Sequence, residues 1–160
     1  MAETKTNVMR LLEQKQIPYT PHSYPYAGGA VDAHTVAGLI GLPPERVYKT
    51  LVTRGAGGGY YVFVVPALGE LDLKAAARAA GEKSIEMIPQ AKLLPLTGYV
   101  HGGCSPLGMK KRFPTVFDDS ALGLESMAVS AGKIGFQVEL APAELCALAG
   151  GRFAPVAKGL

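Results

Sequence analysis

Two apolar segments separated by a glycine-rich turn constrain the fold of this chain most strongly. Residues 47–54 and 60–66 combine β-branched and aromatic side chains, a composition typical of strands. Four of the five residues between them are glycine, which is typical of a hairpin loop. The second segment is almost wholly apolar and therefore predicts a central strand. The chain is thus expected to be built around a β-hairpin.

Helical and shorter strand patterns flank this hairpin on both sides. Helices are expected over residues 5–16, from about 32 to 40, and over 73–80, 89–94 and 143–149. Their predicted caps are Thr4 or Thr6, Asp32 with Gly41, and Asp72 with Gly81. Further strands are expected over residues 19–24, 84–87, 115–118, 127–130 and 136–140, with a loop over 27–29. We predict an α+β fold: a single domain over residues 1–160, in which a mixed, mostly antiparallel, barrel-like sheet is surrounded by helices.

Charge and cysteine content narrow the function classes. A net charge of +3 permits contact with nucleic acid, but a dedicated duplex binder would show a denser basic stripe. Cys104, Cys146 and the three histidines have no metal-ligand spacing, so we expect no metal and no cofactor. Neither a signal peptide nor an apolar run of membrane-spanning length is apparent. We therefore expect a cytoplasmic protein with free thiols and no membrane partner.

The segment Gly102–Gly108, Gly-Gly-Cys-Ser-Pro-Leu-Gly, is the first candidate for a binding loop. Three glycines in seven residues suit a loop whose backbone N–H groups approach an anion or a carbonyl group. The sequence lacks the phosphate-loop and dinucleotide-binding glycine motifs. Lys110, Lys111 and Arg112 follow directly, and they indicate either a phosphate-bearing ligand or simply a solvated basic face.

Lys49 is the second candidate, because strand alternation places it between two apolar residues on one face. Either its strand lies at a sheet edge and the ammonium group reaches water, or the amine points into a cleft. Cys104 lacks a local base and is interpreted as a small buried hydrophobe rather than a nucleophile. The pair Asp118-Asp119 is interpreted as a helix cap or turn rather than a cation site.

These features occur in a particular order along the chain. Tyr48-Lys49-Thr50 is followed by Gly69-Glu70-Leu71-Asp72-Leu73-Lys74, by Gly102-Gly103-Cys104-Ser105-Pro106-Leu107-Gly108, and by Ser130-Ala131-Gly132-Lys133. The combination closely resembles the YbaK/EbsC family of aminoacyl-tRNA deacylases, over nearly the whole chain. The resemblance implies a fold related to the editing domain of bacterial prolyl-tRNA synthetases.

The resemblance also implies the site. Lys49 matches the essential lysine of the family, and Gly102 matches the glycine whose backbone faces the aminoacyl ester. The implied substrate-binding residues are Tyr24, Thr50, Gly103, Ser105, Ser130 and Gln137. Some relatives have aspartate at the position of Gln137, so this chain has one negative charge fewer there. The resemblance places no catalytic role on Cys104.

The implied activity is trans-editing, the removal of cysteine from mischarged Cys-tRNA(Pro), with the substrate's own thiol attacking its carbonyl. The implied partners are aminoacyl-tRNA and prolyl-tRNA synthetase, and Lys110, Lys111 and Arg112 would contact tRNA phosphate. Two alternatives stay open. One is a deacylase for another aminoacyl group, such as Ala-tRNA(Pro). The other is a non-catalytic or regulatory module that binds aminoacyl-tRNA or a synthetase.

Overall fold

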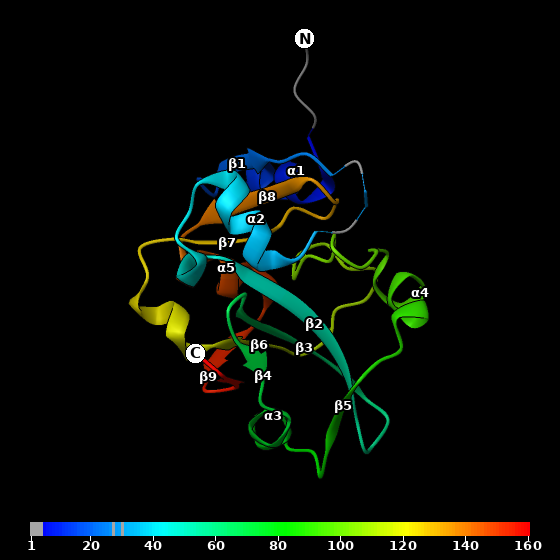
Figure 1. The fold of residues 1–160 in the computed structure, drawn as a ribbon. Coiled ribbons are helices and arrows are strands. Elements are labelled where there is room, and N and C mark those ends of the chain that lie inside the picture. The colour runs from blue at the N-terminus through cyan, green and yellow to red at the C-terminus, as the bar shows by residue number, and fades with distance from the viewer. Residues whose placement is uncertain (1–4, 27, 30) are drawn as a thin grey trace.

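A five-stranded sheet in the order β5-β2-β3-β6-β9 organises the fold, and the predicted hairpin forms its centre (Figure 1). Its strands are β2 (Tyr48–Gly55), β3 (Tyr60–Pro66), β5 (Ile85–Met87), β6 (Thr115–Asp118) and β9 (Arg152–Ala154). The computed structural model describes residues 5–26, 28–29 and 31–160. β2 and β3 pair antiparallel, whereas β3–β6 and β6–β9 are parallel. The central position expected for the second strand of the hairpin is confirmed.

Two smaller sheets complete the β structure of the described residues. β1 (Thr20–Ser23), β8 (Phe136–Leu140) and β7 (Met127–Ser130) form an antiparallel sheet in the order β1-β8-β7. β4 (Glu70–Leu71) pairs antiparallel with β10 (Ala157–Lys158). The α+β class with a mixed, mostly antiparallel sheet is confirmed. The main sheet is open, with β5 and β9 at its edges, and does not close into a barrel.

Four of the five predicted helices begin and end within two residues of the expected positions, whereas the segment expected as a helix over 89–94 is a 3-10 turn (Gln90–Lys92) followed by a helix (Leu93–Thr97). The helices are α1 (Asn7–Gln14), α2 (Ala33–Ile40), α3 (Leu73–Ala80), α4 (Leu93–Thr97) and α5 (Pro142–Ala149), with 3-10 turns η1 (Pro44–Arg46), η2 (Gln90–Lys92) and η3 (Asp119–Gly123). Asp32 and Asp72 cap α2 and α3, and Gly41 and Gly81 end them in the left-handed conformation. Thr6 caps α1. Thr4, the alternative cap, and Ala27, part of the expected loop, lie outside the described residues.

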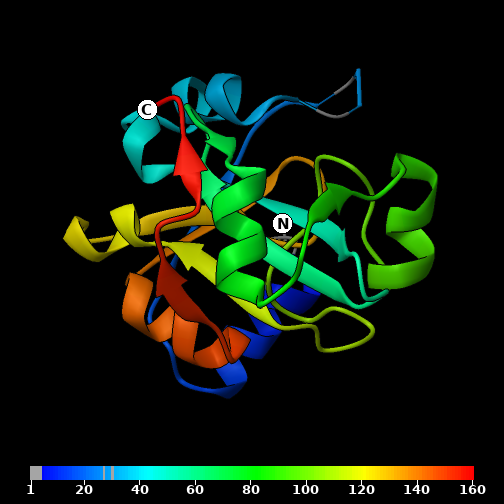
Figure 2. The same ribbon diagram turned by 90° about the horizontal axis from the view of Figure 1, so that it is seen from below.

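The two faces of the β2–β3 hairpin pack against different helices. Tyr48 and Val64 join the core cluster that also contains buried residues of α1 and α5. Phe63 and Val65, on the other face, pack with Ala76 of α3. Seen from below, α3 crosses in front of the sheet, α1 and α5 lie together at one side of the view, and α2 lies at the opposite side (Figure 2). None of the helices within the described ranges is both long and apolar enough to cross a membrane.

Candidate active site

A short stretch of the edge of β2 beside Lys49 is uncovered. Among the described residues, β5 pairs with Thr53, Arg54 and Gly55 of β2, and the Ile88 N–H donates to the Val52 carbonyl oxygen at 3.4 Å. At the other end Val47 forms an isolated bridge with Ala128, so the edge is free only between Val47 and Val52. A pocket of about 280 Å³ opens there, between α2 and the residues that follow α4. It is lined by six of the predicted site residues: Tyr24, Lys49, Thr50, Gly102, Ser130 and Gln137. The fold thus assembles in one pocket residues that are more than one hundred positions apart in the sequence.

The structure favours the second interpretation of Lys49, an amine that points into a cleft. β2 lies between β5 and β3 and is not an edge strand, and the half-buried Lys49 side chain lines the pocket beside the uncovered stretch of β2. It forms no ion pair with a carboxylate among the residues the structure describes. Its ammonium group is therefore available to an anionic or strongly polar ligand.

Two buried oxygen atoms in the pocket lining have no hydrogen-bond partner among the residues that the structure describes. They are the Oγ1 atom of Thr50 and the Oε1 atom of Gln137, a side chain only 6% exposed. Leaving a buried polar atom unpaired costs about 1–3 kcal/mol, so two such atoms in the lining of one pocket are unusual in a folded protein. Ser130 lies opposite Gln137 in the β7–β8 ladder, and its Oγ atom accepts a hydrogen bond from the Gly132 N–H at 3.2 Å. The lining therefore offers unused polar atoms to a ligand.

The glycine loop faces the pocket with its first residues only. Gly102 has φ +87°, which favours glycine, and it lines the pocket together with Cys104. Within the described ranges, the backbone N–H groups of Gly102 and Cys104 donate to no acceptor. They are the kind of free donors that can stabilise a carbonyl oxygen or an oxyanion.

Gly103 and Ser105, two of the predicted substrate-binding residues, lie behind the pocket-lining residues Gly102 and Cys104. A Cβ atom on Gly103 would lie 3.0 Å from the Ile134 backbone nitrogen, so only glycine lets the loop pack this closely on the turn before β8. Ser105 is fully buried, and its Oγ atom accepts a hydrogen bond from the Leu107 N–H at 3.2 Å. Neither residue lines the pocket. Both shape the loop.

Two residues to which the sequence analysis gave no role hold the same loop in place: Asn7 of α1 and Tyr99, in the segment after α4. The Tyr99 hydroxyl donates to the Leu107 carbonyl oxygen at 2.5 Å, and the Asn7 Nδ2 group donates to the Tyr99 hydroxyl at 2.8 Å. A Cβ atom on Gly108 would meet both side chains at under 3.0 Å. Nothing local in the sequence pairs Asn7 with Tyr99, because 92 positions separate them.

Cys104 is held as a neutral thiol. Burial raises the pKa of this thiol to about 12, although a hydrogen bond with Thr97 acts in the opposite direction. Because the thiolate is the nucleophilic form, a thiol with this pKa is unreactive near neutral pH. The pocket also contains Asp32, His34 and His101, which the sequence did not assign to it. Asp32 is engaged by Thr35, whose N–H and Oγ1 groups donate to its carboxylate at 2.9 and 2.7 Å.

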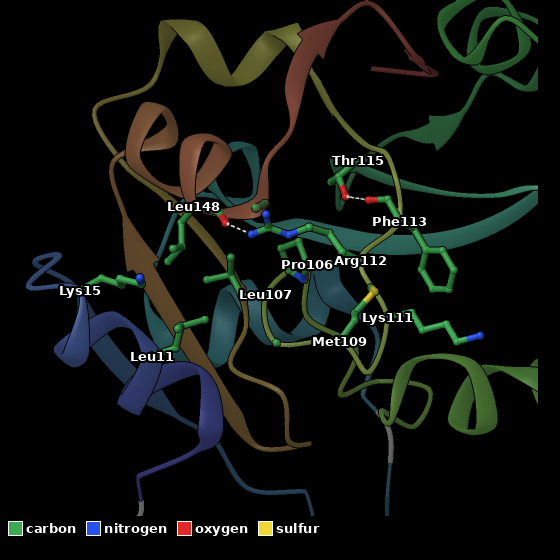
Figure 3. A pocket seen from close by; sticks show the side chains of 12 residues that line it. Leu11, Lys15, Pro106, Leu107, Met109, Lys111, Arg112, Phe113, Thr115 and Leu148 are labelled. Carbon is green, nitrogen blue, oxygen red and sulfur yellow. Dashed lines mark hydrogen bonds between the residues drawn. The ribbon is translucent and has the colours of Figure 1, made fainter.

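The basic run after the loop lies at a different pocket (Figure 3). Lys111 and Arg112 line it together with Lys15 of the α1 C-terminus and Leu148 of α5. Arg112 donates to the Leu148 carbonyl oxygen at 3.2 Å, and the Lys111 side chain extends away from Arg112 in the figure. The Lys110 side chain packs beside Gly98. None of the three cations lines the pocket at Lys49, and their expected contact with tRNA phosphate stays a prediction.

Comparison with known proteins agrees with this geometry. Residues 28–148, well over half of the chain, match the family model described as the aminoacyl-tRNA editing domain. The chain belongs to this family. The matched residues of this editing domain include Lys49, Thr50, the whole glycine loop, Ser130 and Gln137. The resemblance inferred from the motifs is confirmed.

Individual relatives extend the match to nearly the whole chain. The editing domain is 44% identical over 154 residues to EbsC of Enterococcus faecalis, which is named as a candidate Cys-tRNA(Pro)/Cys-tRNA(Cys) deacylase; the match covers 96% of this chain and 94% of EbsC. YwhH of Bacillus subtilis is 28% identical over 109 residues, 68% of this chain and 69% of YwhH. The solved structure of a candidate trans-editing enzyme for prolyl-tRNA synthetase superposes with a TM-score of 0.82 at 26% identity, covering 98% of this chain and all of that one.

Proposed function

We propose that this protein is a trans-editing deacylase that removes cysteine from mischarged Cys-tRNA(Pro). The observation that carries the proposal is the pocket beside the uncovered stretch of β2. There Lys49, the unpartnered oxygens of Thr50 and Gln137, and the free N–H of Gly102 line one small cavity. Membership of the editing-domain family and 44% identity to EbsC support the same activity. The residues 1–160 act as one deacylase domain in the cytoplasm, where aminoacyl-tRNA is used.

The chemistry needs positioning and charge stabilisation more than it needs a nucleophile from the protein, because an aminoacyl ester is already activated. The sulfur of the substrate cysteine attacks its own carbonyl carbon, and a C–S bond forms. The ester bond to the terminal ribose breaks, and the thiol proton ends on the ribose oxygen. The products are free tRNA and a cyclic thiolactone.

Each lining residue has a role in this scheme. The Gly102 N–H donates to the carbonyl oxygen as negative charge develops on it, and Lys49 neutralises the ester region or the adjoining phosphate. Thr50 and Gln137 bind polar groups of the cysteinyl moiety, and Tyr24 and Ser130 close the pocket around it. Gly103 and Ser105 act through the shape of the loop. Gln137 offers an amide where some relatives offer a carboxylate.

The size of the pocket supports a small aminoacyl group. About 280 Å³ lies at or below the lower end of the range of about 300–1,000 Å³ for pockets that hold drug-sized ligands. Because such a pocket holds only the aminoacyl group, selection of the tRNA body must depend on contacts outside it. We propose that prolyl-tRNA synthetase supplies the mischarged tRNA, since phosphate contacts alone carry little sequence information.

The test is deacylation of Cys-tRNA(Pro) by Lys49→Ala, with Lys83→Ala as the control. Lys83 is an exposed lysine outside the pocket lining. Loss of one charge-stabilising group from an acyl-transfer site lowers the rate by about a hundredfold or more, and we expect that loss for Lys49→Ala only. A deacylation rate of Lys49→Ala near that of the wild type would refute the role proposed for Lys49.

The substrate range is tested on Cys-, Ser- and Ala-tRNA(Pro) with the wild-type protein. Loss of hydrolysis with the hydroxyl and methyl analogues supports attack by the substrate thiol. Equal hydrolysis of Ala-tRNA(Pro) would contradict it. Stoichiometric retention of intact Cys-tRNA(Pro) without product would instead indicate a binding module.

A further inference from the structure

A second, larger groove adjoins the pocket at Lys49. It has a volume of about 690 Å³, more than twice that of the pocket, and Lys49 and Leu51 line both. Its other walls come from the segment 70–74, which contains β4 and the start of α3, and from Met87 and Lys158. The segment 70–74 belongs to one of the motifs singled out in the sequence, and the proposed chemistry gives it no role.

The charges of this groove suit a polyanion. Three of its lining residues are lysines, Lys49, Lys74 and Lys158, and two are carboxylates, Glu70 and Asp72. The Asp72 carboxylate is turned toward the helix, where it accepts hydrogen bonds from the backbone N–H groups of Lys74 and Ala75 at 3.1 Å. Glu70 lies directly opposite Lys158 in the β4–β10 ladder. Lys74 is exposed in the first turn of α3, where the helix dipole does not favour a cation.

The groove also exposes apolar side chains beside these lysines. Leu73 is 42% exposed and Met87 is 45% exposed, and both line the groove. Grooves that bind single-stranded nucleic acid combine cations that follow the backbone with flat or apolar surfaces on which bases pack. The arrangement along 70–74, Met87 and Lys158 has both parts.

We propose that this groove binds the single-stranded 3′ end of the tRNA as it leaves the pocket. The inference rests on the proposed function, because a substrate esterified in the pocket must continue past Lys49. Because Lys49 and Leu51 line both the pocket and the groove, the groove continues directly from the pocket. Lys74 and Lys158 contact phosphates, and Leu73 and Met87 pack against a base. These residues bind the substrate; they do not take part in the chemical step.

The experiment compares the wild type with the double variant Lys74→Gln/Lys158→Gln on two substrates. One substrate is Cys-tRNA(Pro), and the other is the cysteinyl ester of adenosine, which lacks the preceding phosphates. We expect KM for Cys-tRNA(Pro) to rise about tenfold with kcat unchanged, and both constants for the adenosine ester to stay the same. Both lysines are exposed. Lys74 lies in α3, where glutamine has a helix propensity close to that of lysine, and Lys158 lies at the end of the two-residue strand β10, so we expect the double variant to keep the fold.

The charge-matched control is Arg10→Gln/Lys83→Gln, which also removes two exposed cations but none from the groove. An equal rise in KM for this control would overturn the proposal, since it would reflect net charge alone. An equal loss on the adenosine ester, or no loss on Cys-tRNA(Pro), would overturn it too.

Binding of an uncharged oligonucleotide with the tRNA 3′-terminal sequence separates this inference from the proposed activity. We expect the slope of log K against log salt to be smaller by about 1.4 in the double variant, because each single-strand phosphate contact contributes about 0.7. A wild type that binds the oligonucleotide through these lysines but deacylates nothing would refute the activity and keep the groove. A slope identical to that of the wild type would refute the groove.

Discussion

Unpaired polar atoms at single residues mark the site more sharply than its charges do. Within the described part of the chain, the Thr50 hydroxyl and the Gln137 amide oxygen are buried without a hydrogen-bond partner, although most of the core around them is aliphatic. Such atoms lower the stability of the free protein, and a ligand that forms hydrogen bonds with them removes this cost. Stability and activity should therefore respond in opposite directions when one of them is removed.

We expect Thr50→Val to keep the fold at least as stable as the wild type while lowering activity. The substitution replaces the unpartnered hydroxyl with a methyl group of similar size, so the free energy of unfolding should stay equal or rise by up to about 1 kcal/mol. Loss of one neutral hydrogen bond to the substrate should lower kcat/KM for Cys-tRNA(Pro) by about threefold to tenfold. Urea unfolding and deacylation kinetics measure the two effects.

Thr53→Val serves as the comparison for this experiment, because the Thr53 hydroxyl is buried and already donates to the Tyr61 carbonyl oxygen at 3.0 Å. It should lose stability and retain activity. A destabilised Thr50→Val with full activity would show that the Thr50 hydroxyl serves the fold and not the ligand.

The buried thiol of Cys104 leads to a pH prediction. Its pKa in the folded state is raised to about 12 from a usual value near 9, so the folded protein holds this proton more tightly than the unfolded chain does. The resulting stabilisation is complete below about pH 9 and is lost as the pH rises toward 12. We expect Cys104 to resist alkylation by iodoacetamide at pH 8 in the folded protein and to react readily in urea.

Cys104→Ala should retain most of the deacylation rate, because the thiol is not the nucleophile in the proposed step. Mass spectrometry of the alkylated peptides resolves Cys104 from Cys146. Rapid labelling of folded Cys104 at pH 8 together with loss of activity in Cys104→Ala would assign it a catalytic role instead.

Between elements, one carboxylate connects the main sheet to the C-terminal segment. Asp118 ends β6 and is only 3% exposed. Its Oδ1 atom accepts hydrogen bonds from the backbone N–H groups of Val156 and Ala157 at 3.0 and 2.9 Å, and its Oδ2 atom accepts from Ser120 at 3.2 Å. The expected cap or turn at this position is confirmed by the hydrogen bond to Ser120. The hydrogen bonds to Val156 and Ala157, at the start of β10, were not expected. These hydrogen bonds help to fix β10 beside β4, and Lys158 of β10 lines the groove.

We expect Asp118→Ala to lower the free energy of unfolding by about 3 kcal/mol or more, because three backbone donors lose a charged acceptor. Asp118→Asn keeps one acceptor oxygen and should lose clearly less. Urea denaturation of the three proteins measures the difference. A loss below about 1 kcal/mol in Asp118→Ala would mean that these backbone groups find other partners.

On the scale of the whole molecule, local signals in the sequence identified the helices and the long strands. Asp72 and Gly81 define the ends of α3 because each acts on its own neighbours in sequence. β4, β9 and β10 were not predicted, since strands of two or three residues exist only through distant partners. Arg152 lies beside Val116, and Ala157 lies opposite Leu71.

In the site, too, the sequence predicted what depends on neighbouring residues and missed what depends on residues far apart in the chain. The strand pattern singled out Lys49 and the glycine-rich composition singled out the loop that begins at Gly102, and the family resemblance assigned both residues to the site. They did not indicate that Ser105 turns away from the pocket, since a motif does not record which side of a loop faces the ligand. The bracing pair Asn7 and Tyr99 could be found only from the fold.

The short pairing between β5 and β2 has a consequence for the protein in concentrated solution. An uncovered strand edge is a template on which another chain can add a strand, and lysine at such an edge is a common protection against this addition. Here the uncovered stretch is short, because Val52 and Val47 have partners at its two ends, and Lys49 lies within it, so the residue proposed to handle the substrate would also help to keep copies of the protein from joining edge to edge. A substrate bound at Lys49 would cover the same stretch, so we expect edge-to-edge association to be weaker in the liganded protein than in the free protein.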